Sequence, residues 1–286
     1  MNSVFSLAPM DVVDTPSNDT SDDTSSIDEV FYSEAGSDTL YATGDTNVIL
    51  AGVDYSIGNS GKTIFLSNQP DATNHTIEGT AGRDVIATGS GRDIIYADEG
   101  DNEIACLFGG NKTIYAGDGD DLINTSGGND VIHAGEGNNY INAGDGRNII
   151  YAYAGNDTIL TGAGNDTIYA GGGNNTINSG VGNDIIYTGS GNDYINASLG
   201  NDIIWLQGGQ DTVVIALDNG VDTINNFQLG QTQIGLWGGL TFNDLTIAQD
   251  NGATLISASA GNELLASLTD VQASSLDASS FVTVTV

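Results

Sequence analysis

Aspartate recurs along this chain at a spacing of nine residues, and each copy stands two positions before an isoleucine or valine. The stretch GAGNDTIYAGGGNNTINSG (162–180) shows two neighbouring copies, in which Asp166 is replaced by Asn175. Carboxylates in regular array are ligands for hard cations such as Ca²⁺, whereas Asp and Asn also form turns without any metal. We predict metal ligation by ten residues: Asp84, Asp93, Asp121, Asp130, Asp157, Asp166, Asp184, Asp193, Asp202 and Asp211.

The composition favours a cation as the natural partner. The chain has 38 acidic residues and five basic ones, a formal net charge of -33. This charge excludes nucleic acid and anionic membranes as natural partners. The single cysteine, Cys106, rules out a disulfide framework, and we expect it to be a small packing residue.

The aliphatic residue of each repeat predicts the elements that position the carboxylates. Fifteen of these positions, from Ile77 to Ile204, are isoleucine, and Val213 follows. A strand of three residues turns the isoleucine inward, and the glycines between strands permit a tight reversal. Eighteen residues then complete one coil with two strands. The expected fold is all-β: a parallel β-roll, which is a two-sheet solenoid, followed by a small C-terminal β cap.

The repeats resemble the nonapeptide G-G-x-G-x-D-x-U-x of RTX (repeats-in-toxin) proteins over residues 79 to 236. The resemblance implies a parallel β-roll that binds calcium in its turns. One departure is consistent, since the first glycine of the motif is usually Ala, Thr or Ser. In one repeat Lys112 replaces the Asp and Phe108 replaces a turn glycine. We expect no calcium there, with Lys112 paired to Asp93 or Asp130.

Calcium sites would form between turns on one edge, so the aspartate positions are compared eighteen residues apart. On one edge Asp and Asn largely alternate, which gives sites with one charged ligand. Two carboxylates flank a site only at Asp166/Asp184, Asp184/Asp202 and Asp193/Asp211. Tight binding is therefore expected toward the C-terminal end, and Asp184→Ala should weaken calcium binding more than Asp121→Ala. Without calcium we expect a largely disordered chain, because the core is thin and the stacked carboxylates repel.

The residue after each isoleucine points outward, and its type differs between the two sheets. One sheet presents the aromatic residues Tyr96, Tyr115, Tyr151, Tyr169, Tyr187 and Trp205, with His133 among them. The other presents mainly Ala and Asn. An aromatic strip of this size suits self-association or the binding of cell-surface polysaccharide. Alternatively, tyrosine only reflects strand preference, or a terminal segment covers the strip.

We divide the chain into a flexible acidic leader (1–35), irregular N-terminal coils (36–78), the calcium-binding β-roll (79–215) and a C-terminal cap (216–286). VDTINNFQLGQTQIGL (221–236) resembles the segment that closes the roll in RTX proteins. The last residues, LDASSFVTVTV (276–286), are similar to an uncleaved type I export signal, or else form a final edge strand.

The expected function is that of a secreted, calcium-dependent structural or cell-surface protein, in a surface layer, sheath, filament or biofilm matrix. The alternative is an adhesin-like carbohydrate-binding module that uses the tyrosine strip. No enzyme site is expected, since His75 and His133 lie far apart and occupy unrelated repeat positions. The start of the chain has no basic, apolar signal peptide, and no segment is apolar enough to span a membrane. We therefore expect export to the cell exterior without an N-terminal signal.

Overall fold

The computed structural model describes residues 74, 76–79 and 81–285. Ahead of them it describes the backbone of six strands: Thr20–Asp23 (β1), Glu29–Tyr32 (β2), Thr39–Ala42 (β3), Thr46–Leu50 (β4), Asp54–Ile57 (β5) and Lys62–Leu66 (β6). The chain forms two compact units, Met1–Asp145 (the N-terminal unit) and Gly146–Val286 (the C-terminal unit). Strands β1 and β2 fall within the expected leader, and His75 lies outside the described residues.

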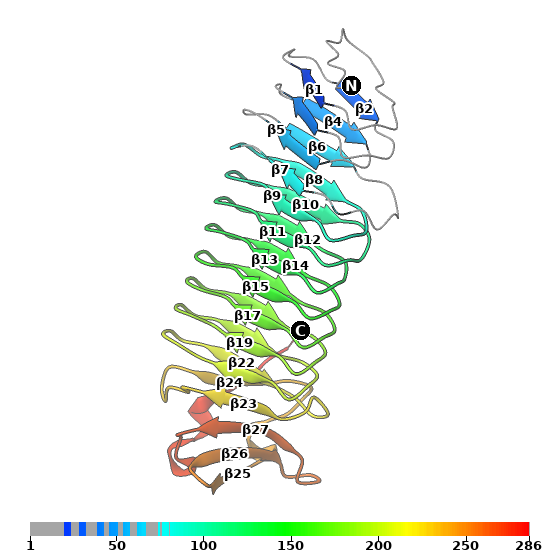
Figure 1. The fold of residues 1–286 in the computed structure, drawn as a ribbon. Helices are drawn as coiled ribbons and strands as arrows, with labels where there is room; N and C mark the ends of the chain where they lie inside the picture. Colours follow the sequence, from blue (N-terminus) through cyan, green and yellow to red (C-terminus); the bar gives the residue numbers. More distant parts are fainter. Residues whose placement is uncertain are drawn as a thin grey trace. The chain divides into compact units, whose positions relative to one another are not determined.

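In the N-terminal unit, odd-numbered and even-numbered strands form two parallel sheets, and each coil contributes one strand to each sheet (Figure 1). Its remaining strands are Thr76–Glu78 (β7), Val85–Thr88 (β8), Ile94–Tyr96 (β9), Glu103–Cys106 (β10), Thr113–Tyr115 (β11), Leu122–Asn124 (β12), Val131–His133 (β13) and Tyr140–Asn142 (β14). The pairing aligns Ile95 with Ile114, so the one inserted residue makes a coil of nineteen residues. The register also aligns Phe65 of β6 with Ile86 of β8.

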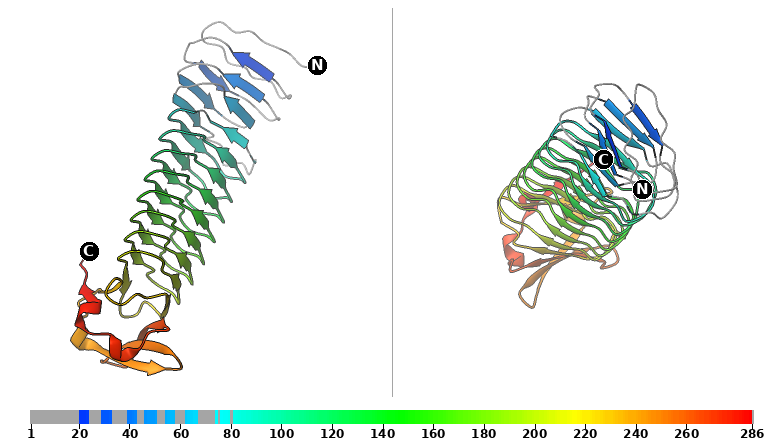
Figure 2. Two further views of the ribbon diagram at one scale, coloured as in Figure 1. Left: turned by 90° about the vertical axis from the view of Figure 1, so that its left-hand side faces the viewer. Right: turned by 45° about the horizontal axis from the view of Figure 1, so that its top comes forward.

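The C-terminal unit repeats this architecture with a strict eighteen-residue step up to Trp205 (Figure 2). Its coil strands are Ile149–Tyr151 (β15), Thr158–Leu160 (β16), Thr167–Tyr169 (β17), Thr176–Asn178 (β18), Ile185–Tyr187 (β19), Tyr194–Asn196 (β20), Ile203–Trp205 (β21), Thr212–Ile215 (β22), Asp222–Asn225 (β23) and Gln233–Leu236 (β24). The predicted parallel β-roll is confirmed in each unit.

A thin core of aliphatic side chains fills the space between the two sheets. Every isoleucine of the repeat from Ile77 to Ile204 is at most 2% exposed, and so is Val213. The residues on either side of each isoleucine point outward, as the two-residue period of a strand requires. Cys106 is buried among them, and burial raises the pKa of its thiol to about 12. The thiol is therefore a packing group, as expected.

The turns depend on backbone conformations that only glycine adopts freely. Gly135 and Gly137 have φ angles of 87° and 118°. A Cβ on either residue would also meet the backbone carbonyl of the preceding coil, at Gly117 and Gly119 respectively. Neighbouring turns are thus stacked in backbone-to-backbone contact, which brings their carbonyl groups together along the edge of the roll.

A small antiparallel cap closes the C-terminal unit, as expected. Leu245–Asp250 (β25), Ala253–Ala258 (β26) and Leu264–Thr269 (β27) form it, and β27 pairs in parallel with β23. Three short 3₁₀ turns, Phe242–Asp244, Ala273–Ser275 and Ala278–Ser280, connect these parts. The last strand, Phe281–Thr283 (β28), pairs in parallel with β24 and forms the edge of that sheet. Among the described residues, no helix has the length and apolar character that crossing a membrane requires.

Aromatic side chains stack in rows on the outside of the odd-numbered strands. In the N-terminal unit the Tyr96 and Tyr115 ring centroids are 5.1 Å apart, and those of Tyr115 and His133 are 4.7 Å apart. In the C-terminal unit Tyr151, Tyr169 and Tyr187 follow at 4.9 Å, with Trp205 6.4 Å beyond. The rings are nearly parallel, with interplanar angles of at most 9°. The predicted division into an aromatic sheet and an Asn-rich sheet is confirmed.

Candidate metal centre

All ten predicted metal ligands are buried in the turns, immediately before a strand. Each is at most 2% exposed, although a lone carboxylate seldom leaves water. The even-numbered strands follow Asp84 and Asp121 in the N-terminal unit and Asp157, Asp193 and Asp211 in the C-terminal unit. The odd-numbered strands follow Asp93 and Asp130, and then Asp166, Asp184 and Asp202. The carboxylates thus form one row along each edge of each unit.

One oxygen of these carboxylates is used to join successive coils. The backbone N–H of Asp166 donates to Asp184 Oδ1 at 2.8 Å, and that of Asp184 donates to Asp202 Oδ1 at 2.8 Å. On the other edge Asp193 donates to Asp211 Oδ1 at 3.0 Å. The stacked carboxylates therefore each accept a hydrogen bond from the coil before, and this keeps one oxygen in a fixed direction.

In several of these residues the second carboxylate oxygen has no hydrogen-bond partner. Oδ2 is buried and unsatisfied in Asp121, Asp166, Asp184, Asp193, Asp202 and Asp211. Burial raises the pKa of Asp121 to about 7 and those of Asp166 and Asp193 to about 6. A buried acceptor without a donor costs about 1–3 kcal/mol, and more when it is charged. A cation at Oδ2 would remove this cost.

Backbone carbonyls complete the surroundings of the carboxylate position, and the Asn residues reveal which ones. Asn139 Nδ2 donates to the carbonyls of Gly135 and Gly137 at 3.1 and 3.2 Å, which are four and two residues before it. Asn102 Nδ2 donates to the carbonyl four residues before it, at 3.1 Å. Asn148 and Asn175 direct their Nδ2 at the carbonyl two residues before, at 3.5 and 3.4 Å. The amide thus supplies donors to carbonyls that face the site.

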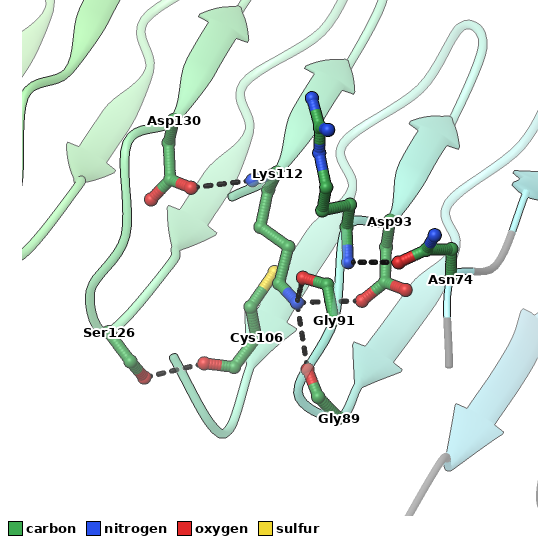
Figure 3. Close-up of polar contacts among 9 residues, drawn as sticks. Asn74, Gly89, Gly91, Asp93, Cys106, Lys112, Ser126 and Asp130 are labelled. Atoms are coloured by element: carbon green, nitrogen blue, oxygen red, sulfur yellow. Dashed lines mark hydrogen bonds and ion pairs between the residues drawn. The ribbon is translucent and has the colours of Figure 1, made fainter. Parts of the chain in front are cut away.

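An Asp in the same position has no hydrogen to donate when ionised, so its turn carbonyls need a positive group from elsewhere. In one coil that group is an ammonium. Lys112 Nζ lies 2.8 Å from Gly89 O, 3.0 Å from Gly91 O and 2.7 Å from Asp93 Oδ2 (Figure 3). Gly89 and Gly91 stand four and two residues before Asp93. The expected pairing of Lys112 with Asp93 is confirmed.

Asp222, which is not among the ten predicted metal ligands, extends the carboxylate row. It is 4% exposed, and Asp202 N–H donates to its Oδ1 at 3.3 Å. Burial and the nearby Asp202 raise its pKa. The signal was present in VDTI (221–224), where Asp again precedes Ile by two residues. The resemblance predicts only closure of the roll for this segment.

The side chains alone do not build a complete site. Within the described part of the chain, no three His, Cys, Asp or Glu side chains form a group that could hold a metal ion. Ca²⁺ takes six to eight oxygens and accepts backbone carbonyls readily. One or two carboxylates with the turn carbonyls fit such a hard cation, and the oxygen donors of the described turns disfavour softer metals.

A second side-chain ladder runs along the exposed outside of the turns, one residue before each carboxylate position. Asn165 Oδ1 accepts the N–H of Asn183 at 2.9 Å, and Asn183 Oδ1 accepts that of Asn201 at 2.8 Å. Here the N–H of the later coil donates to the earlier one, which is opposite to the inner row. Turns with Asn in this position are therefore hydrogen-bonded to the coil after them as well as through the inner row.

The family model of the RTX calcium-binding nonapeptide repeat matches residues 23–61, 73–104 and 108–213 through overlapping segments. The chain belongs to the RTX calcium-binding nonapeptide repeat family. Among solved structures, the crystal structure of the extracellular lipase LipA from Serratia marcescens is similar at 15% sequence identity and a TM-score of 0.23. That match covers 79% of this chain and 45% of the lipase, so this RTX protein spans less than half of it. No curated protein matches.

Proposed function

We propose that this RTX chain is a secreted protein of the cell exterior whose roll orders when calcium binds between its turns. The observation that carries the proposal is the set of buried Asp Oδ2 atoms that have no donor. They lie beside turn carbonyls, and in other coils the equivalent carbonyls accept hydrogen bonds from an ammonium or an amide. Nine of the ten predicted aspartates are assigned as ligands, and Asp222 is added; Asp93 is left out because Lys112 occupies its Oδ2 and its turn carbonyls. The carbonyls four and two residues before each Asp are assigned as their partners.

A calcium titration tests this function. The purified protein, first stripped of metal with a chelator, is titrated with calcium while circular dichroism and light scattering are recorded together. We expect β structure to appear with calcium, because neutralising the buried carboxylates removes the main penalty on the coils. Magnesium at equal ionic strength is the control, since it demands octahedral geometry and dehydrates reluctantly. A compact, protease-resistant protein after exhaustive chelation would refute the proposal.

We further propose a structural or surface-associated role, with self-association through the aromatic sheet. Tyr169 and Trp205 are 38% and 39% exposed, and their neighbours on the same face include Ile203. The stacked rings cover each other's faces, so ring edges and hydroxyl groups are left at the surface. A sugar ring stacks on an aromatic face, and these faces are covered by neighbouring rings. The stacked rings therefore favour protein contact over the polysaccharide alternative.

Substitutions on the two sheets separate these possibilities. Replacing Tyr151, Tyr169 and Tyr187 with Ser should shift the calcium-loaded protein to smaller particles in light scattering. The matched control replaces Asn142, Asn178 and Asn196 with Ser on the opposite sheet and should leave particle size unchanged. Equal particle size in all three proteins would count against self-association. A loss of binding to insoluble polysaccharide in the tyrosine variant alone would instead support the carbohydrate-binding alternative.

A further inference from the structure

Lys112 is one of only five basic residues in the chain, and it is buried. Its side chain and that of Asp93 are both 0% exposed, and the Nζ–Oδ2 distance is 2.7 Å. An ammonium has three N–H groups and no acceptor. The acceptors are the carbonyls of Gly89 and Gly91 and the Asp93 carboxylate, so all three hydrogens are used (Figure 3). The lysine therefore lies in a preformed site for positive charge.

The oxygens around Lys112 Nζ match those that other turns present. Asn139 uses the carbonyls four and two residues before it, and Lys112 uses the carbonyls four and two residues before Asp93. The two donors differ in origin. The Asn139 amide belongs to the turn itself, whereas the Lys112 ammonium reaches back from the following coil. Its Nζ thus joins two coils through the same kind of oxygen set that we assign to calcium.

The backbone of Lys112 is joined to the next coil as well. Its N–H donates to Asp130 Oδ1 at 2.6 Å, which is the inner-row contact of an ordinary repeat. Strand β11, directly after Lys112, pairs in register with β9 and β13. One residue therefore connects three successive coils of the N-terminal unit.

We propose that Lys112 is a built-in substitute for a calcium ion, which keeps the coils of β9, β11 and β13 closed at any calcium concentration. The proposal rests on the calcium function proposed above, since it assigns one of those cation positions to a side chain. A charge that is covalently part of the chain cannot dissociate, so the order of this region does not depend on the calcium concentration. It provides an ordered segment on which neighbouring coils assemble when calcium arrives.

Hydrogen exchange in the metal-free full-length protein tests whether Lys112 keeps these coils closed. With excess chelator, we expect amides of β9, β11 and β13 to exchange at least tenfold more slowly than those of β17 and β19. In Lys112→Met this difference should disappear, because the carbonyls and Asp93 lose their donor. The control is Arg83→Met, which removes an exposed cation bound to Glu103 at 3.1 Å and should keep the protection. Equal exchange of both regions in the unaltered protein would overturn the proposal.

Calcium stoichiometry gives a second, independent test. In native mass spectrometry, Lys112→Asp should bind at least one more calcium ion than the unaltered protein, because a carboxylate then replaces the ammonium beside Asp93. Lys112→Met should bind no additional ion. If Lys112→Asp gains no ion while the unaltered protein binds calcium, the substitution idea is wrong and the proposed function stands. If the unaltered protein binds no calcium, the proposed function fails. A loss of protection in Lys112→Met would then still show that Lys112 holds these coils together.

Discussion

At the scale of single residues, the exchange of Asp for Asn changes how a turn satisfies its carbonyls. Asn139 donates to Gly135 and Gly137 with its own amide, whereas Asp184 has an unsatisfied Oδ2 and no hydrogen to offer. The Oδ1 atom has the same role in both, since it accepts an N–H from the preceding coil. The alternation seen in the sequence thus separates turns that need a cation from turns that do not.

This difference predicts the effect of Asp184→Asn on calcium binding. The substitution keeps the hydrogen-bond acceptor but removes one charge from two adjacent sites that have two carboxylates each. We expect calcium affinity to fall by roughly tenfold or more, measured by isothermal titration calorimetry, because affinity follows the number of charged ligands. Asp121→Asn is the matched comparison and should have a smaller effect, since its neighbours Asn102 and Asn139 are neutral. An effect of Asp121→Asn as large as that of Asp184→Asn would contradict this ranking.

Raised carboxylate pKa values predict an unusual response to acid. Burial places the pKa of Asp121 at about 7 and those of Asp166 and Asp193 at about 6, above the ordinary value of 3.8. The folded form then binds protons more tightly than the unfolded form, so metal-free stability falls as the pH rises from about 4 to about 7. Metal-free protein should have more β structure by circular dichroism at pH 4.5 than at pH 7.5.

The acid response has its own control. A variant with Asn at positions 121, 166 and 193 should show a smaller change between the two pH values, because it lacks three of the titrating groups. General relief of charge repulsion would instead act almost equally on both proteins. Metal-free protein that is less structured at pH 4.5 would show that protons cannot take the place of the cation.

At the scale of elements, the backbone of the turns determines where the carbonyls point. Gly191 has a φ of 121° and stands two residues before Asp193, and its Cβ would meet the carbonyl of Gly173. Gly208 stands three residues before Asp211 and has open space around the same position. The two glycines therefore have different requirements although both belong to repeat turns.

We expect Gly191→Ala to lower the thermal midpoint of the calcium-loaded protein far more than Gly208→Ala. The unfavourable φ costs about 1–2 kcal/mol, and the contact with Gly173 adds to it. Differential scanning calorimetry in saturating calcium measures both variants under conditions where every coil is folded. Similar midpoints for the two variants would mean that neighbouring turns do not pack as closely as described.

The strands were predictable from the sequence because the isoleucine period is long and nearly unbroken, and the aromatic face followed from the alternation within each strand. The carbonyl directions were not predictable, since they depend on φ angles and on stacking with the next coil. Asp222 was missed because it stands eleven positions after Asp211, so the nine-residue step no longer identifies it. The division into two units at Asp145 has no counterpart in the repeat pattern.

At the scale of the whole molecule, the C-terminal residues combine two predicted roles. Phe281 is 8% exposed, and β28 pairs with β24, so this segment completes a sheet. We proposed from the sequence that residues 276–286 also direct export. Their removal should abolish appearance of the protein in the culture medium, measured by immunoblotting of cells and medium.

The export experiment needs a folding control, since truncation also exposes the edge of β24. Phe281→Ala removes the buried side chain but keeps the segment, and it should weaken calcium-dependent folding by about 3–5 kcal/mol while leaving export intact. Normal export of the truncated protein would show that the segment is only an edge strand.

The nineteen-residue coil has a consequence for assembly fidelity. A chain of nearly identical eighteen-residue coils could pair each strand with a wrong partner and lose little, because isoleucine would still face isoleucine. Only one coil contains the inserted residue and the buried lysine. A displaced alignment would separate Lys112 from Gly89 and Gly91, and would leave Asp93 without its ammonium. Between β7 and β14, this irregular coil therefore favours one alignment of the strands over the displaced ones.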